Sequence, residues 1–545
     1  MEVYTNFLNA SQSTQLFIVS SVLVLALITS IIYRYVNESN FIFGSFVIIH
    51  FGFGYFLNLI SEYDFIYHLL LYILPSLVLI FIITPFLPSP KKRVDKIRNT
   101  TIDKDFTIYY KTNHGKIPIN LKRGVFIAGS AGAGKTDSAF LPIIDHALNL
   151  PLTSLYYDYK DFELTRKILA LKTDKTLPIY TLAPSDIRYS HRCNPLQPGQ
   201  INDRNDLLSL IQVLVDNFST SKGENIFFSQ AAGGALAGTA WRLLEEEQLN
   251  PYSSLPMAAM IVHAKPLEEL EKFIRGNATS SILASEFLDS FINDRQMAPV
   301  KATLSAITKQ ICDPTISYLF SGNDFNLDLN NPEDPKNLIC VNHPKYRSVL
   351  SPLLAMVMQC AINQMSHQGK FPSLLCFDEG STVKLHDFHL APATLRSYNI
   401  ATVFGLQDKV QGELIYDIRE IKALLANLSS YLFGKVNDPD TSKFYQTYFE
   451  LIKEEQISIS KGSNWLDTSE RVNVSERETT KHKAYEFNRL SPGEMFMFNE
   501  KGENMKAQLK QYKYEELDLP LLNDVSKPTI DLEFKKIIQI AEQIS

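Results

Sequence analysis

Residues 129–136 read Gly-Ser-Ala-Gly-Ala-Gly-Lys-Thr, which matches the phosphate-binding pattern G-x-x-x-x-G-K-[ST]. A short run rich in β-branched and aromatic residues, 123–128, precedes this loop, and a segment with helical spacing, 137–148, follows it. Strand, glycine loop and helix form the context that the pattern requires. The sequence therefore predicts an α/β fold in which a nucleotide binds beside a sheet.

The loop presents its phosphate-binding groups mainly through the backbone. Gly129, Gly132 and Gly134 carry no Cβ, so the backbone can turn its N–H groups inward. Those donors and the start of the following helix would hold the β- and γ-phosphates. Lys135 would add positive charge, and Thr136 would offer a hydroxyl to magnesium. We therefore expect ATP and Mg²⁺ as cofactors, with the nucleotide held by Gly129, Ser130, Ala131, Gly132, Ala133, Gly134, Lys135 and Thr136.

Length, charge and cysteine usage bound the class of protein. A chain of 545 residues allows roughly two to four domains. The formal net charge of −6 excludes a global basic field that would attract nucleic acid. The five cysteines form no C-x-x-C pair, which argues against a zinc site or a disulfide framework and for a reduced, cytosolic environment.

The first 90 residues differ from the rest, because Arg34 is their single basic residue and they contain no lysine. Three apolar runs, 16–33, 41–60 and 65–87, are each long enough to cross the hydrocarbon core of a bilayer. The basic cluster Lys91–Arg93 directly after the third run marks the cytosolic side. We predict three transmembrane helices, with the N-terminus outside and the phosphate loop in the cytosol.

Alternatives stay open for this N-terminal region. The second run contains glycines, His50 and Asn58, so the bundle has two spans if that run does not cross. Any single run could instead be a buried core helix. No positively charged segment precedes the first run, which argues against a cleaved signal peptide.

The remaining chain alternates between strand-like and helical segments, except in its middle. A second strand, 152–161, completes a βαβ unit with the loop, which favours a parallel sheet covered by helices. Residues 200–325 break this alternation, because few strand candidates interrupt their helical segments. These segments are 207–218, 227–247, 267–275, 281–294 and 300–312.

The strand pattern resumes at 337–341, and the polar stretch 454–483 is expected to form strands or loops at the edge of the sheet. A short amphipathic helix is expected near the C-terminus. The predicted organisation is therefore transmembrane helices at 1–90, the first part of the nucleotide-binding domain at 91–199, an inserted all-α domain at 200–325, the second part of the nucleotide-binding domain at 326–520 and a C-terminal tail helix at 521–545.

An apolar strand beginning at residue 372 runs into two adjacent carboxylates, Asp378 and Glu379. Both would lie at the carboxyl edge of the sheet, beside the phosphate loop. Asp378 would hold magnesium, directly or through water, and Glu379 would orient and deprotonate the attacking water. An ordinary acidic strand end is the alternative.

Two further residues are candidates for a role in hydrolysis. Gln407 ends the next apolar strand, where a neutral amide can sense the γ-phosphate or the attacking water, although a helix cap is the alternative. Arg396 ends the preceding helix, and in a ring of subunits it could stabilise transition-state charge at the neighbour's nucleotide. A solvated arginine that interacts with the helix dipole is the alternative. The predicted catalytic residues are therefore Glu379, Lys135, Gln407 and Arg396.

In their order along the chain, these motifs resemble type IV secretion coupling proteins, the TraG/TraD class of conjugative DNA-transfer ATPases. Gly129–Thr136 matches the family's Walker A loop, and Asp378–Glu379 matches its Walker B carboxylates. Asp158–Lys160 resembles its Asp-Pro-Lys-Gly turn, with Tyr159 in place of proline and Asp161 in place of glycine. Further matches are the spacing of Arg396 and Gln407, Asn194–Leu196, Leu319–Gly322, Asp324–Phe325, Asn427, Gly434 and Asp440–Thr441.

The resemblance covers nearly the whole chain and implies a RecA-like P-loop NTPase domain with an inserted all-α domain and an N-terminal transmembrane helix bundle. It also implies a homo-hexamer at the bacterial inner membrane, in which Arg396 reaches the ATP of a neighbouring subunit. The implied partners are single-stranded DNA with a covalently attached relaxase, and the components of a type IV secretion channel. The helical domain would choose the cargo.

Three other functions stay open at the level of sequence. The same motor could deliver protein effectors only, or it could move duplex DNA as FtsK/HerA-like translocases do. The chain could also be a nucleotide-gated membrane scaffold that does not hydrolyse ATP. The duplex alternative expects a sequence-reading DNA domain at the C-terminus, and the tail 517–545, which is mostly one amphipathic helix, is too short for one.

Overall fold

The computed structural model describes residues 106–150, 152–218, 226–292, 294–461, 470–515 and 517–544. The chain divides into two units, Met1–Asp95 and Lys96–Ser545, and the three apolar runs predicted to cross a membrane lie outside the described residues. Within the described part, one helical segment, Pro344–Met365, is long and apolar enough to span a bilayer. Its apolar window is 83% buried inside the protein, and most of the segment is the core helix α17 (Arg347–Met365).

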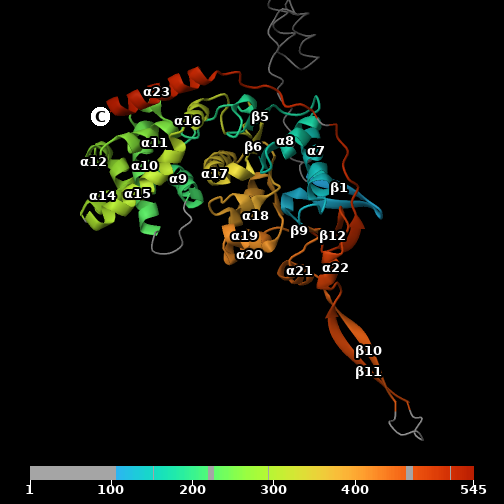
Figure 1. Cartoon of the computed structure of the whole chain (residues 1–545). Helices are drawn as coiled ribbons and strands as arrows, with labels where there is room; N and C mark the ends of the chain where they lie inside the picture. The colour runs from blue at the N-terminus through green and yellow to red at the C-terminus, as the bar shows by residue number, and fades with distance from the viewer. Residues whose placement is uncertain are drawn as a thin grey trace, which may run out of the picture. The chain divides into compact units, whose positions relative to one another are not determined.

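A nine-stranded mixed sheet organises the described unit (Figure 1). Its strand order is β13-β12-β9-β3-β8-β7-β4-β6-β5. The strands from β9 to β5 pair in parallel, whereas β12 and β13 extend one edge in antiparallel pairing. The strands are β3 (Val125–Ala128), β4 (Thr153–Asp158), β5 (Ile179–Leu182), β6 (Asn337–Val341), β7 (Ser373–Phe377), β8 (Ile400–Leu406), β9 (Ser430–Phe433), β12 (Glu494–Phe498) and β13 (Asn504–Gln508).

The central strands are apolar on both faces because both faces are covered. β3 shows how the pleat divides its residues between two cores. Val125 and Ile127 belong to the buried cluster that contains α7 (Leu141–Asn149), whereas Phe126 and Ala128 belong to the cluster that contains α17. The sheet therefore separates two hydrophobic cores. A two-stranded hairpin of β1 (Thr107–Thr112) and β2 (Gly115–Asn120) also contributes to the α7 side.

Between β5 and β6 the described chain is helical. Helix α10 contacts six other helices of this helical insertion, α9, α11, α12, α13, α14 and α15. Gly238 permits one of these close approaches, since a Cβ there would lie 2.8 Å from the carbonyl oxygen of Ser280. The helices are α9 (Arg204–Phe218), α10 (Ile226–Glu245), α11 (Leu255–Ala264), α12 (Leu267–Arg275), α13 (Ala278–Leu283), α14 (Ser285–Asp289), α15 (Asp294–Ile311) and α16 (Pro314–Ser321).

The two ends of the helical insertion are joined to each other. The Cys193 N–H donates to the Leu319 carbonyl at 2.9 Å. Arg192 and Asp324 are linked twice, because the Arg192 N–H donates to Asp324 Oδ2 at 2.7 Å and the Asp324 N–H donates to the Arg192 carbonyl at 3.1 Å. The insertion therefore leaves the sheet and returns to it at neighbouring points.

Parts of the predicted helix pattern in this region are wrong. The single helix predicted at 281–294 is broken into α13, α14 and a 3₁₀ turn, because the backbone at Ala284 leaves the helical region. Helices α11 and α16 were not predicted. Both begin with proline in their first turn, behind the capping side chains of Ser254 and Asp313.

The polar stretch at 454–483 does form strands, but it does not lie at the edge of the main sheet as predicted. β10 (Leu451–Lys461) and β11 (Glu470–Thr480) pair with each other as a separate antiparallel ladder (Figure 1). The two edges of the main sheet are formed instead by β13, which pairs with β12, and by β5, which pairs with β6. Periodicity identifies a strand, whereas its pairing partner is decided by the rest of the fold.

The C-terminal helix α23 (Lys527–Gln543) packs against α11 and α16 of the helical insertion (Figure 1). Glu533 accepts a hydrogen bond from Arg192 at 3.1 Å, at the base of the insertion. The segment that precedes α23 passes beside the chain that follows β3, since the Tyr512 N–H donates to the Asp137 carbonyl at 2.9 Å. The chain therefore returns to the helical insertion after it has completed the sheet.

The packing of β8 against β7 generates a prediction for Gly405→Ala. A Cβ at Gly405 would lie 2.2 Å from the carbonyl oxygen of Asp378 and 2.6 Å from Phe140 Cζ. Because neither neighbour can move freely, we expect the free energy of unfolding to fall by about 1–3 kcal/mol. The midpoint of chemical denaturation measures this change.

Gly412→Ala is the matched control. A Cβ at Gly412 in α19 (Lys409–Ile415) would meet only the side-chain ends of Leu406 and Ile421, at 3.1 and 3.2 Å. Alanine also favours a helix over glycine by about 1 kcal/mol, so this variant should retain or gain stability. Equal denaturation midpoints for the two variants would contradict the packing at β8.

Candidate nucleotide-binding site

The phosphate loop is anchored by the ends of the two parallel strands that flank β3 in the sheet. It connects β3 to the π-helical turn η4 (Lys135–Phe140). The Gly129 N–H donates to the carbonyl of Leu406, the last residue of β8, at 3.2 Å. The Ser130 N–H donates to the carbonyl of Lys435, just beyond β9, at 2.7 Å. These bonds place the loop at the carboxyl edge of the sheet.

A left-handed backbone explains two glycines of the loop, and close backbone packing is a second reason for one of them, Gly134. Gly132 and Gly134 have φ angles of 77° and 80°, in the left-handed region that favours glycine. A Cβ on Gly134 would lie 2.6 Å from the nitrogen of Gly493, and that nitrogen donates to the Ala133 carbonyl at 2.9 Å. Gly493 and Lys435 were missed by sequence reasoning, because each is an isolated residue of no motif that becomes adjacent to the loop only in the folded chain.

Lys135 extends from the end of the loop into a buried position, with 6% of its surface exposed. Its Nζ donates to the Gly129 carbonyl at 2.5 Å and lies 3.8 Å from Glu379 Oε1. Burial lowers the pKa of Lys135, although the charges of Glu379 and Asp378 oppose this shift. A phosphate beside Nζ would favour the protonated form and would offer an acceptor in place of the Gly129 carbonyl.

Thr136 and Asp378 meet although 242 positions separate them in the chain. The Thr136 hydroxyl donates to Asp378 Oδ2 at 2.7 Å. The second carboxylate oxygen, Oδ1, is buried and has no hydrogen-bond partner among the residues that the structure describes. An unpartnered carboxylate oxygen beside a hydroxyl is a hard-oxygen donor set that suits Mg²⁺.

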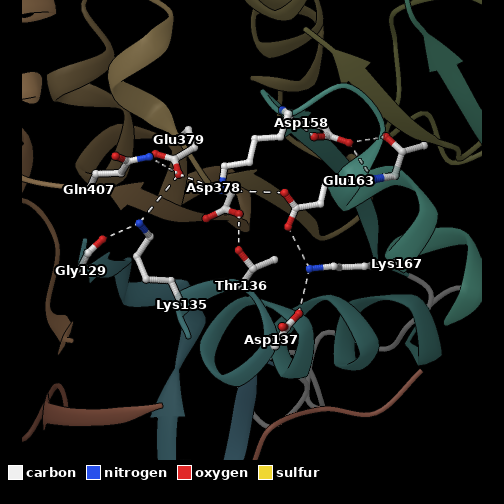
Figure 2. Close-up of polar contacts among 12 residues, drawn as sticks. Gly129, Lys135, Thr136, Asp137, Asp158, Glu163, Lys167, Asp378, Glu379 and Gln407 are labelled. Carbon is white, nitrogen blue, oxygen red and sulfur yellow. Dashed lines mark hydrogen bonds and ion pairs between the residues drawn. The ribbon is translucent and has the colours of Figure 1, made fainter. Parts of the chain in front are cut away.

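Glu379 is 2% exposed and lies among three donors from different elements. Figure 2 shows Gln407 and Lys135 pointing toward its carboxylate. The Gln407 amide donates to Oε1 at 3.1 Å, and Lys160 Nζ lies 3.6 Å from the same oxygen. Burial raises the pKa of Glu379, against the opposing effect of the Lys135 charge. The carboxylate is thus held in place while its affinity for a proton is increased.

Lys160 reaches Glu379 from the turn that follows β4. Asp158 organises this turn, because its carboxylate accepts from the backbone N–H groups of Lys160 and Thr165 at 3.0 and 2.8 Å. Burial raises the pKa of Asp158 to about 6. Asp161, at the position where the resembled family has glycine, adopts φ 49° and so keeps a left-handed backbone without a glycine. Lys160 was noted in a motif but was not predicted as a site residue.

A second charged group supports the first turn after the loop. Lys167 Nζ donates to Asp137 Oδ1 at 2.9 Å and to Glu163 Oε1 at 3.1 Å, as Figure 2 shows. Burial alone would lower the pKa of Lys167, but the two carboxylates outweigh it and raise that pKa. These three residues link η4 to α8 (Glu163–Ala170). Sequence reasoning missed them because helical ion pairs are common on any surface.

Arg396 is not brought to this site. It is exposed on a 3₁₀ turn, Leu395–Tyr398, which is the last of three short turns where a single helix was predicted. That turn precedes β8, whereas Gln407 follows β8. Arg396 therefore lies at the amino edge of the sheet, opposite the edge that holds the phosphate loop. Its predicted action on a neighbouring subunit stays a prediction.

The structure thus assembles Lys135, Thr136, Asp378, Glu379 and Gln407 at one edge of the sheet. These donors and the unpartnered Asp378 Oδ1 fit a nucleoside triphosphate with Mg²⁺. The loop supplies N–H groups and Lys135 supplies a cation for the phosphates, while Thr136 and Asp378 supply metal ligands. Glu379 has the burial and raised pKa of a general base. The arrangement is chemically suited to moving a phosphoryl group to water.

The contact between Thr136 and Asp378 generates a prediction for nucleotide binding. Thr136→Val keeps the shape of the side chain but removes the hydroxyl. We expect it to abolish the gain in ATP affinity that Mg²⁺ provides while leaving the Mg²⁺-free affinity near that of the wild type. Titration calorimetry with and without Mg²⁺ measures both. Thr136→Ser should behave as the wild type, and an unchanged Mg²⁺ effect in the valine variant would remove Thr136 from the metal site.

Comparisons with known proteins bear on the family and the fold of this chain. The family model for the type IV secretion-system coupling protein DNA-binding domain matches residues 111–491. No curated protein matches the chain. The plasmid coupling protein TrwB in complex with the non-hydrolysable GTP analogue GDPNP is 16% identical, with a TM-score of 0.58 over 79% of this chain and 98% of that chain. TrwB in complex with ADP and Mg²⁺ is 15% identical, with a TM-score of 0.58 over 78% and 95%.

The unbound form of the bacterial conjugative coupling protein TrwB is similar to the same degree, with 15% identity and a TM-score of 0.56 over 77% of this chain and 93% of that chain. At such identity the likeness establishes the fold, which is RecA-like α/β with a mixed sheet. The family model itself spans more than half of the sequence and includes both the phosphate loop and the paired carboxylates. The chain therefore belongs to the type IV secretion-system coupling proteins.

Proposed function

We propose that this protein is an ATPase that drives conjugative DNA transfer at the bacterial inner membrane. It would couple a complex of relaxase and single-stranded DNA to a type IV secretion channel. The observation that carries this proposal is the buried Glu379 carboxylate, which lies beside the Thr136–Asp378 pair and is contacted by Gln407 and Lys135. Membership of the coupling protein family supports the cargo and the channel.

Each residue of the site would have a different role in ATP hydrolysis. Bound Mg²⁺–ATP would supply the phosphoryl group to be transferred and a divalent charge that offsets the negative charge of the transition state. Lys135 would release the Gly129 carbonyl and contact the phosphates instead. Glu379 would accept the proton of the attacking water, and Gln407 would orient that water from the end of β8. Lys160 would stabilise the ionised form of Glu379.

The nucleotide would bind at the boundary between two subunits of a homo-hexamer. Arg396 supports this part of the proposal, because it is exposed and lies at the sheet edge opposite its own phosphate loop. From there it cannot act on the nucleotide of its own subunit, whereas a neighbour in a ring could bring its nucleotide to Arg396.

The remaining parts of the chain would hold the ATPase at the membrane and bind its cargo. Residues 1–90 would form the transmembrane bundle, 91–199 and 326–520 the two parts of the RecA-like domain, and 521–545 the C-terminal tail. The helical insertion, placed at 200–325, would select the cargo. TrwB, which shares the fold, is described as a conjugative and plasmid coupling protein, and this supports a DNA cargo for the present chain.

Glu379→Gln and Lys135→Thr test the hydrolytic proposal as a pair. Glu379→Gln removes the base but keeps the shape, so ATP should still bind while hydrolysis falls by about 10²–10⁴-fold. Lys135→Thr should weaken ATP binding itself. Both variants should abolish DNA transfer between cells without changing membrane insertion. Transfer that survives Glu379→Gln would instead favour a nucleotide-gated scaffold.

The same enzyme has a predicted pH dependence. Glu379 acts as a base only when ionised, and burial raises its pKa. The hydrolysis rate should therefore fall on acidification at a higher pH than for an ordinary glutamate, which has a pKa near 4.3.

Single-stranded DNA should stimulate hydrolysis by the wild type. An absence of stimulation, with a relaxase or effector still bound, would favour a motor for protein cargo only.

Mixing two inactive variants tests the placement of Arg396. Arg396→Ala subunits keep Glu379, and Glu379→Gln subunits keep Arg396. If the arginine acts between subunits of a ring, an equal mixture should recover roughly a quarter of the wild-type ATPase rate, because about that share of boundaries pairs two intact groups. Mass measurement of the mixture checks for hexamers. No recovery in mixed hexamers would rule out action between subunits.

A further inference from the structure

A cavity of about 740 Å³ opens between the helical insertion and the carboxyl edge of the sheet. One wall comes from α9 and α10, and Figure 1 shows α9 beside α17. The other wall comes from segments that follow β6, β7 and β8, represented by Lys345, Lys384 and Leu414. None of the lining residues belongs to the phosphate loop, so this cavity is separate from the nucleotide site.

The charged side chains that line the cavity are mostly cationic. Lys345, Arg347 and Lys384 line it together with one acidic residue, Asp216, which already accepts a hydrogen bond from Gln212 at 2.6 Å. Lys384 Nζ also lies 3.6 Å from Glu420 Oε2, so the excess positive charge comes from Lys345 and Arg347. Lys345, in the 3₁₀ turn Pro344–Tyr346, and Arg347, the first residue of α17, are both exposed. Among the residues that the structure describes, Arg347 has no acidic partner. In a chain with a net charge of −6, this local excess of positive charge suits an anionic ligand.

The cavity also exposes apolar surface beside these cations. Ile226 on α10 is 53% exposed and Leu414 on α19 is 70% exposed, and both line it. A ligand that carries regular negative charges and flat apolar groups would use both kinds of surface. Single-stranded DNA has this composition, and the volume, which is that of an ordinary ligand pocket, holds a short stretch of one strand rather than a duplex.

One wall of the cavity is tied to Glu379. The Thr382 hydroxyl donates to the Glu379 carbonyl at 2.7 Å. Two residues further on, the Lys384 backbone is held by Asn217 of α9, which donates to its carbonyl at 2.6 Å and accepts from its N–H at 3.0 Å. Thr382, Lys384 and Asn217 all line the cavity. A ligand bound there would therefore contact the short segment that carries the proposed catalytic base.

We propose that this cavity binds the phosphodiester backbone of single-stranded DNA, with Lys345 and Arg347 contacting phosphates and Leu414 contacting bases. Binding would shift the segment 379–384 and so make ATP hydrolysis responsive to DNA. This inference rests on the proposed function and adds the DNA-binding site to it.

The double variant Lys345→Ala/Arg347→Ala in the full-length chain tests the proposal. Fluorescence anisotropy with a labelled oligothymidine should show affinity about 25-fold weaker at 0.1 M salt, and the slope of log affinity against log salt should fall by about 1.4, as expected for two lost phosphate contacts. ATPase activity without DNA should be unchanged, and stimulation by DNA should be lost. Lys345→Arg/Arg347→Lys keeps both charges and should retain binding.

A second basic groove provides the matched control. Lys510 and Lys513 line a groove of about 700 Å³ beside Tyr109. Lys510→Ala/Lys513→Ala removes the same charge there and should leave DNA affinity and stimulation unchanged. If the Lys345/Arg347 variant binds DNA with wild-type affinity, or if the control variant loses more affinity, the cavity is not the DNA-binding site. Neither result would contradict the proposed ATPase function. A wild-type chain that binds no single-stranded DNA overturns both the cavity and the DNA cargo.

Discussion

The site depends on the parallel pairing of β3 between β8 and β9. This register brings the phosphate loop, which follows β3, to the carbonyls of Leu406 and Lys435 at the ends of its neighbours. Because β7 pairs in parallel with β8, Asp378 and Glu379 emerge at the same edge. The Thr136–Asp378 hydrogen bond is a consequence of that shared direction, since residues so far apart in sequence have no local reason to meet.

Burial at this edge sets the electrostatics of the site. Lys135 and Glu379 are both removed from water, and burial moves their pKa values in opposite directions, each toward the neutral form. A triphosphate would reverse the shift of Lys135 and leave Glu379 free to accept a proton from water. Without nucleotide, the Lys135 cation lies against the Glu379 base. Nucleotide binding would move the Lys135 charge to the phosphates and leave Glu379 to act on water. The cavity at Lys345 and Arg347 lies along the same segment as this base.

Local sequence patterns predicted the central elements well and their surroundings poorly. The apolar runs that became β3, β6, β7 and β8 were identifiable because buried parallel strands are apolar on both faces. The pairing of β10 with β11 was not, because alternation specifies a strand and not its neighbour. Of the six predicted catalytic or metal-binding residues, which are Lys135, Thr136, Asp378, Glu379, Arg396 and Gln407, only Arg396 was not brought to the site.

The sequence by itself determined the phosphate loop, the strand that ends in Asp378 and Glu379, and the position of Gln407 at the end of the next strand, since each is a short motif with its own local chemistry. The tertiary structure decided what surrounds them. It placed Lys160 against Glu379, Gly493 against Gly134, and Asn217 against Lys384. These contacts join residues from separate elements, and their distances follow from strand order and helix packing, which no local pattern encodes.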